Sequence, residues 1–205
     1  MATQLTPAMV SEVSICNMAL SWLSANRISS LDDPSNEAAL CKDNYSFARN
    51  AVLEERMWSF AQAREVSTTE DMDPWGTQYQ HDKPLNWLQV FRVYCDVSSQ
   101  NPDYWRTSDG WKMEDGFILS NDATVYMWGV KEITDTGKFS FQVAQTIAAR
   151  LAALLAMPLS ASKQQQAQMW ALYQALLADA AARDGQQGSN EKIRSSSLVD
   201  ARRGR

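Results

Sequence analysis

The stretch from Phe139 to Asp184, FSFQVAQTIAARLAALLAMPLSASKQQQAQMWALYQALLADAAARD, decides the fold. Its first half places apolar residues at the spacing of one helical face: Ala144, Ile147, Ala148, Leu151, Leu154 and Leu155. Pro158 predicts the end of this helix, because proline lacks an amide N–H and its ring clashes with the preceding turn. Ser162 is suited to cap a second helix, with Gln165 as its capping-box partner. That helix carries four residues on one side: Trp170, Tyr173, Leu177 and Ala181. The stretch therefore predicts a helical hairpin that packs or assembles.

Two more helices are predicted upstream of this hairpin. Residues 8–25 carry apolar side chains at helical spacing, namely Ile15, Met18, Ala19, Trp22 and Leu23. Asp33 is suited to the N-cap of the next helix and Pro34 to its first position. We expect that helix to run to about Phe60, which makes it roughly 40 Å long.

The middle of the chain has the pattern of strands. From Trp87 to Val97 apolar residues alternate to one side. Asp115-Gly116 predicts a two-residue hairpin turn between residues 111–113 and 117–119, and another strand is expected over 124–130. These segments predict a small antiparallel β-meander.

The fold class expected from these patterns is α+β: a mainly α-helical bundle of long antiparallel helices with the small meander inserted. Four parts are predicted. They are an N-terminal helical pair (1–61), the β-meander and its loops (62–138), a C-terminal helical hairpin that completes the bundle (139–184), and an extended C-terminal tail (185–205).

Composition and charge narrow the class of protein. The chain has 205 residues and a net charge of −5, but residues 191–205 carry +3, so the body is acidic and the tail is basic. We find no apolar run of eighteen residues and expect no membrane span, and the N-terminus lacks the pattern of a secretion signal. Cys16, Cys41 and Cys95 have no close spacing, which favours reduced thiols in a cytosolic setting.

Several segments, taken in order, resemble the tail tubular protein A family of bacteriophages, which are head-to-tail adaptors. The segments are RLAALLAMPLSASKQQQAQMWALYQALLADAAARD (150–184), ICNMALSWLSANRISSLDD (15–33), RMWSFAQAR (56–64) and PLNWLQVFRV (84–93). In the last of these, Asn86 and Trp87 stand where the family commonly has Asp and Cys. The resemblance spans roughly residues 10 to 185 and rests on the ordered set, since no single motif is specific.

The resemblance implies a structural virion protein without enzymatic activity or cofactor. Such a protein would form a dodecameric ring between the portal protein and a tail nozzle resembling tail tubular protein B, with tail fibres as a further partner. It would be assembled in the cytoplasm of the host bacterium. The ring would seal the filled head and continue the ejection channel, enclosing duplex DNA without binding it specifically.

Two other classes of function stay open from the residues. One is a virion-associated glycan hydrolase, for which Asp71 and Asp73 are candidate carboxylates, although loop acidity is the simpler interpretation. The other is a regulator that binds a helix of another protein. His81 is the only histidine, and with dispersed cysteines it predicts no metal site.

Two groups of residues are predicted to form contacts. The alanines of the hairpin would allow close packing, and loop tryptophans would anchor neighbouring subunits; the candidates are Ala148, Ala152, Trp75, Trp105 and Trp111. The tail is expected to dock on the portal and order there through Ile193, Arg194, Leu198, Val199, Arg202, Arg203 and Arg205.

Overall fold

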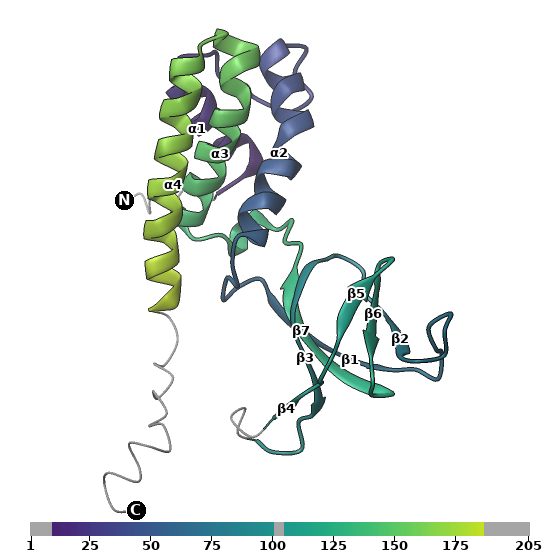
Figure 1. The fold of residues 1–205 in the computed structure, drawn as a ribbon. Helices are drawn as coiled ribbons and strands as arrows, with labels where there is room; N and C mark the ends of the chain where they lie inside the picture. Colours follow the sequence, from purple (N-terminus) through teal and green to yellow (C-terminus); the bar gives the residue numbers. More distant parts are fainter. Residues whose placement is uncertain (1–9, 101–104, 187–205) are drawn as a thin grey trace, which may run out of the picture.

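The computed structural model describes residues 10–100 and 105–186, and these form a helical module and a β module (Figure 1). The described residues contain four α-helices: α1 (Glu12–Trp22), α2 (Asn36–Glu54), α3 (Phe141–Ser160) and α4 (Lys163–Gly185). They also contain seven strands in two antiparallel sheets. The chain enters the β module after α2 and returns to the helical module at α3.

The helical module is built around α3, which packs against α1, α2 and α4. Alanine and leucine dominate α3, and small side chains let its neighbours approach closely, so Ile147, Leu151 and Leu155 are fully buried. The predicted apolar faces are confirmed for α1 and α3, and on α4 for Trp170, Tyr173 and Leu177; on α4 the core contains Ala180 in place of the predicted Ala181. On α4 the fully buried Tyr173 faces this core.

The predicted helix ends need three corrections. Asp33 does not cap α2; its carboxylate accepts the backbone N–H groups of Ser29 and Ser30, and Ser35 is the N-cap. Helix α2 ends at Glu54, not Phe60, so it is about 28 Å long. The reason is Trp58, whose buried indole N–H folds back and donates to the carbonyl of Val52 at 2.8 Å, which satisfies a terminal acceptor of the helix.

The third correction concerns Pro158, which does not stop α3. It lies in the last turn, and the helix ends at Ser160; the next residue, Ala161, is the C-cap, and its left-handed backbone (φ 52°) reverses the chain. Ser162 then caps α4 as expected, accepting the amide of Gln165 at 3.2 Å. In a full capping box the Gln165 side chain would also bond to the backbone N–H of Ser162. Among its described contacts, the Gln165 side chain instead donates to the carbonyl of Trp22.

Among the described helices, α3 is long and apolar enough to cross a membrane by length and composition alone, which does not test the expectation of no membrane span. However, 61% of that window is buried inside the protein, and core helices meet the same criterion.

The four-stranded sheet has the order β1-β7-β3-β4, and the three-stranded sheet has the order β2-β6-β5. The strands are β1 (Gln62–Thr68), β2 (Tyr79–Asp82), β3 (Trp87–Asp96), β4 (Arg106–Thr107), β5 (Lys112–Glu114), β6 (Phe117–Ser120) and β7 (Thr124–Lys131). The two sheets share a core of Trp87, Val90, Val93, Ile118, Val125 and Met127. The predicted hairpin turn is confirmed, since Asp115 and Gly116 both have positive φ (49° and 84°), as a type I′ turn requires.

These sheets overturn the predicted fold class. The molecule is not a mainly helical bundle with a small meander, because the described β module has two sheets and a core of its own. The pattern missed β1, β2 and β4. Strand β1, QAREVST, has no buried residue and lacks a clear apolar face, so periodicity alone does not identify it.

The two modules meet at a partly buried ionic joint. The Arg49 side chain on α2 is only 6% exposed and pairs with Glu132, directly after β7. Glu132 also accepts the side-chain amide of Asn50 at 3.1 Å. Val130 and Ile133 on either side of Glu132 belong to the helical core, so the end of β7 is held in the helical module.

Candidate functional site

The outer face of the four-stranded sheet gathers aromatic and basic side chains. In the register of β1 against β7, Arg64 lies opposite Trp128 and Val66 lies opposite Tyr126. On the other side of β7, Arg92 lies opposite Trp128 and Tyr94 lies opposite Tyr126. Because side chains alternate across a strand, these residues share one face, while Val125 and Met127 point to the core between the sheets.

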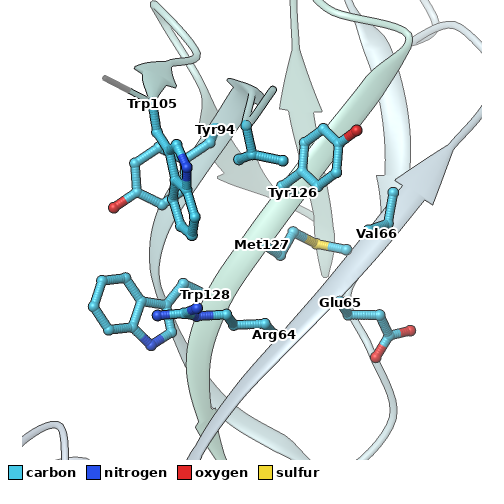
Figure 2. A pocket seen from close by; sticks show the side chains of 9 residues that line it. Arg64, Glu65, Val66, Tyr94, Trp105, Tyr126, Met127 and Trp128 are labelled. Carbon is cyan, nitrogen blue, oxygen red and sulfur yellow. The ribbon is translucent and has the colours of Figure 1, made fainter. Parts of the chain in front are cut away.

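This face is hollowed into a pocket with a volume of about 430 Å³, called here the arginine–tryptophan pocket (Figure 2). It is lined by Arg64, Glu65, Val66, Tyr94, Val97, Trp105, Tyr126, Met127 and Trp128. Figure 2 shows the Arg64 guanidinium beside Trp128, with Trp105 and Tyr94 on one side of the hollow and Tyr126 and Val66 on the other. The walls are chiefly rings and aliphatic groups, as in sites that bind apolar or aromatic groups.

The charge in this pocket comes from an arginine held by aromatic rings. The guanidinium carbon of Arg64 lies 4.9 Å from the ring centroid of Trp128 and 5.2 Å from that of Trp105. Among the described residues, no carboxylate lies within ion-pair distance of Arg64. The cation therefore stays available to an acidic or aromatic partner group while its position is fixed by cation–π contacts.

Trp105 is itself held in place. Its indole N–H donates to the carbonyl of Ser99 at 2.7 Å, and its ring packs edge-on against Tyr94 with centroids 5.3 Å apart. The wall that it forms is thus set before any partner arrives, which lowers the entropy cost of binding.

A second exposed feature is a loop that presents Trp75. The Asp73 carboxylate accepts the amide and hydroxyl of Thr77 at 2.6 and 2.8 Å and the amide of Gln78 at 3.2 Å. Gly76 donates to the Asp73 carbonyl at 2.8 Å, so Pro74 and Trp75 are the central residues of a tight turn. Trp75 is 86% exposed at the tip.

The predicted interface residues have very different positions. Trp105 lines the pocket, Trp111 packs partly against the core of the β module, and Trp75 projects from its loop. Ala148 and Ala152 are fully buried in the helical module, which leaves them no surface with which to contact another subunit. The seven predicted portal-binding residues between 193 and 205 lie outside the described residues.

Of the two candidate hydrolase carboxylates, Asp71 and Asp73, Asp73 lacks the raised pKa of a general acid. Hydrogen bonds from Thr77 hold the pKa of Asp73 below its usual range, whereas a general acid needs a raised pKa. Within residues 10–100 and 105–186, each carboxyl group with a distinct pKa shift is lowered, for Asp33, Glu37, Asp73 and Asp96 alike.

The β module also contains a buried polar cluster that the sequence did not indicate. His81 is fully buried, and its ring nitrogens contact the Ser67 hydroxyl at 3.1 Å and the Asp122 carbonyl at 3.0 Å. The Asp122 carboxylate accepts the Ser108 hydroxyl at 2.8 Å instead of orienting His81. These groups satisfy one another's hydrogen bonds and tie the two sheets together.

Sequence reasoning identified Trp105 but missed the other walls of the pocket. The available signal was the segment TVYMWGVK (124–131), in which both alternating sets are apolar or aromatic. A strand with two apolar faces is covered on both, and here the described chain covers only one of them fully. No family model and no curated protein matches this chain.

Proposed function

We propose that this protein is a structural virion subunit: a head-to-tail adaptor that forms a ring between the portal protein and the tail nozzle. The ring would be dodecameric, seal the filled head and surround duplex DNA without specific binding. Tail fibres would be a further partner, and the protein would act without a cofactor.

One observation carries this proposal. Three of the four segments that resemble the adaptor family, residues 15–33, 56–64 and 150–184, come together in the helical module and make its defining contacts. Asn17 closes the first loop, donating to the Ile28 carbonyl at 2.9 Å and accepting its amide at 2.8 Å. Trp58 caps α2, as described above. The resembling residues therefore pack in one core, and this shared position supports the proposal.

The third of these segments ties its helices together through polar contacts. The hydroxyl of Tyr173 donates to Glu55 at 3.1 Å and accepts from Arg150 at 2.9 Å, linking α4 to α3 and the end of α2. Ser59 donates to Asp184 through its hydroxyl at 2.6 Å and its amide at 3.0 Å. The central tyrosine of the last helix, part of the resemblance, thus has a structural role here.

The proposal is tested by composition and mass. We expect the protein in purified virions of the phage that encodes it, and a ring-sized complex when it is co-expressed with the portal protein of the same genome. Native mass spectrometry of the complex gives the copy number. Absence from virions together with failure to bind the portal ring would contradict the proposal.

The tail is tested separately, with the full-length protein as the control. Deleting residues 186–205 should leave the circular dichroism spectrum of the body unchanged and abolish stable attachment to the portal ring. The reason is that the tail combines apolar anchors with arginines that form bidentate pairs with carboxylates. Full occupancy of the truncated protein on portal rings would show that attachment lies elsewhere.

A further inference from the structure

The Trp75 loop, residues 69–79, is built to hold one large apolar side chain away from the body. Its base is closed by a bridge between Met72 and Tyr79 and by the bond from the Asp73 amide to the Gln78 carbonyl at 2.8 Å. A tryptophan on a loop that is already ordered loses little conformational freedom on binding. Tryptophan is also the residue type most enriched among those that dominate binding energy at interfaces.

The arginine–tryptophan pocket offers what an indole ring requires. Its volume of about 430 Å³ lies in the range of sites for small organic groups, about 300–1,000 Å³. Arg64 can stack on an incoming ring, and Trp105 and Tyr126 supply edges and faces for aromatic packing (Figure 2). Val66, 57% exposed at the rim, adds an aliphatic contact.

Charge favours the Trp75 loop over the C-terminal tail (residues 191–205) as the segment that fills the pocket. Asp73, Glu114 and Asp115 line the same cleft as Trp75, with Lys112 as the single basic residue there. The pocket face carries Arg64 and Arg92, with Glu65 at its edge. An acidic loop is attracted to this face, whereas the basic tail of residues 191–205 would be repelled by the arginines.

The two features belong to different sheets of the β module. The cleft beside Trp75 is lined by residues of β2, β5 and β6, whereas the arginine–tryptophan pocket is lined mainly by residues of β1, β3 and β7. In Figure 1 the loop before β2 projects at the right edge, away from β3 and β4. A contact between copies would therefore join two different surfaces. Such a head-to-tail contact closes into a ring when the rotation between copies allows it.

We propose that Trp75 of one copy inserts into the arginine–tryptophan pocket of the next copy and that this contact links neighbouring subunits. The inference rests on the ring-forming function proposed above, and it assigns ring formation to the β module instead of the alanine-rich helices. Each copy then contributes one tryptophan and one pocket.

The test uses two full-length variants, each missing one half of the contact. Trp75→Ala removes the inserted side chain, and Arg64→Glu reverses the charge of the pocket; both sites are exposed, so folding should be preserved. Phe47→Ala is the matched control, because Phe47 is 70% exposed on α2 in the other module. Sedimentation equilibrium over a wide concentration range measures self-association of each protein.

We expect the wild type and Phe47→Ala to form large assemblies with similar affinity. Each of the two contact variants should self-associate about 30-fold more weakly or worse, the loss typical of a dominant interface residue. An equimolar mixture of the two variants should stop at a dimer, because only one intact tryptophan and one intact pocket can meet.

Each other result overturns the inference. Wild-type strength in both variants would show that the ring forms through another surface, and the proposed function would stand. Loss in Arg64→Glu alone would mean that a segment other than Trp75 fills the pocket. A wild type that is monomeric at all concentrations would exclude the contact and leave the portal-binding assay to decide the function.

Discussion

Replacing Glu132 with leucine tests whether the ionic joint holds the two modules together. The Arg49 side chain is 6% exposed, and Glu132 is the described carboxylate nearest to its guanidinium group. The remaining described partners are Asn50, whose side-chain oxygen accepts from Nε at 3.1 Å, Glu12 at 4.0 Å, and the ring of Tyr45, whose centroid lies 5.8 Å from the guanidinium carbon. After Glu132→Leu the buried cation would therefore keep only one described carboxylate partner, the distant and 42% exposed Glu12.

The expected cost follows from this geometry. Breaking a buried ion pair by removing one partner costs about 3–5 kcal/mol. The Glu132 side chain is 29% exposed and Glu12 remains, so we expect about 2–3 kcal/mol for Glu132→Leu. Replacing both partners, with Arg49→Met added, should cost less than about 1 kcal/mol, because no charge is then left unpaired. The interaction energy between the two sites should thus be at least about 1–2 kcal/mol, and any loss in Arg49→Met alone adds to it.

Urea unfolding of the wild type, both single variants and the double variant gives this cycle. Far-ultraviolet circular dichroism reports mainly on the helices, and tryptophan fluorescence also reports on the β module. In Glu132→Leu the two probes should separate, since the joint no longer couples the modules. The reasoning would be refuted if the double variant lost the sum of the free energies of unfolding lost by the two single variants, and if circular dichroism and fluorescence gave the same unfolding curve for Glu132→Leu.

Three further changes follow from the described contacts. Gly129→Ala would place a Cβ against the backbone carbonyl of Gln89 on β3 and should lower the free energy of unfolding by about 1–3 kcal/mol or more. Gly185→Ala, with no atom within 4 Å of the added Cβ, should be neutral or stabilising in thermal melts. Ala148→Trp should overpack the core and cost about 1–3 kcal/mol of monomer stability at any protein concentration; loss of assembly with unchanged monomer stability would contradict this. The hydrogen bonds from Thr77 lower the pKa of Asp73, so the Trp75 loop should stay ordered above the usual aspartate pKa of about 3.9 and lose its order as the pH falls through the lower pKa of the folded state. Amide hydrogen exchange measures this order, and Asp73→Asn should remove its dependence on acid.

Local chemistry explains which elements the sequence could predict. The Asp115-Gly116 turn depends on two residues that tolerate positive φ, so this dipeptide alone predicts the hairpin. The helices α3 and α4 have long apolar stripes and a serine cap, and they were found with their ends displaced by a few residues. The end of α2 was missed because it depends on Trp58 folding back to Val52, a tertiary contact without a local signal.

The size of the β module could not be predicted for a related reason. Strand β1 is held by its partner β7 and presents Arg64 and Glu65 to the exterior, so its letters resemble a polar loop. Strand β4 has two residues, both exposed, and exists only because β3 lies beside it. Such strands form because a neighbouring strand pairs with them, and the periodicity of their own sequence does not predict them.

The same pairing creates the candidate site. Arg64 comes from β1, Trp128 from β7 and Trp105 from the approach to β4, and their separation in sequence hides their contact. What the sequence does carry is the second apolar face of β7, with Tyr126 and Trp128 alternating with Val125 and Met127. The core between the sheets accounts for one face. The other has aromatic rings and an arginine without a carboxylate among the described residues, which is the surface that a partner would be expected to cover.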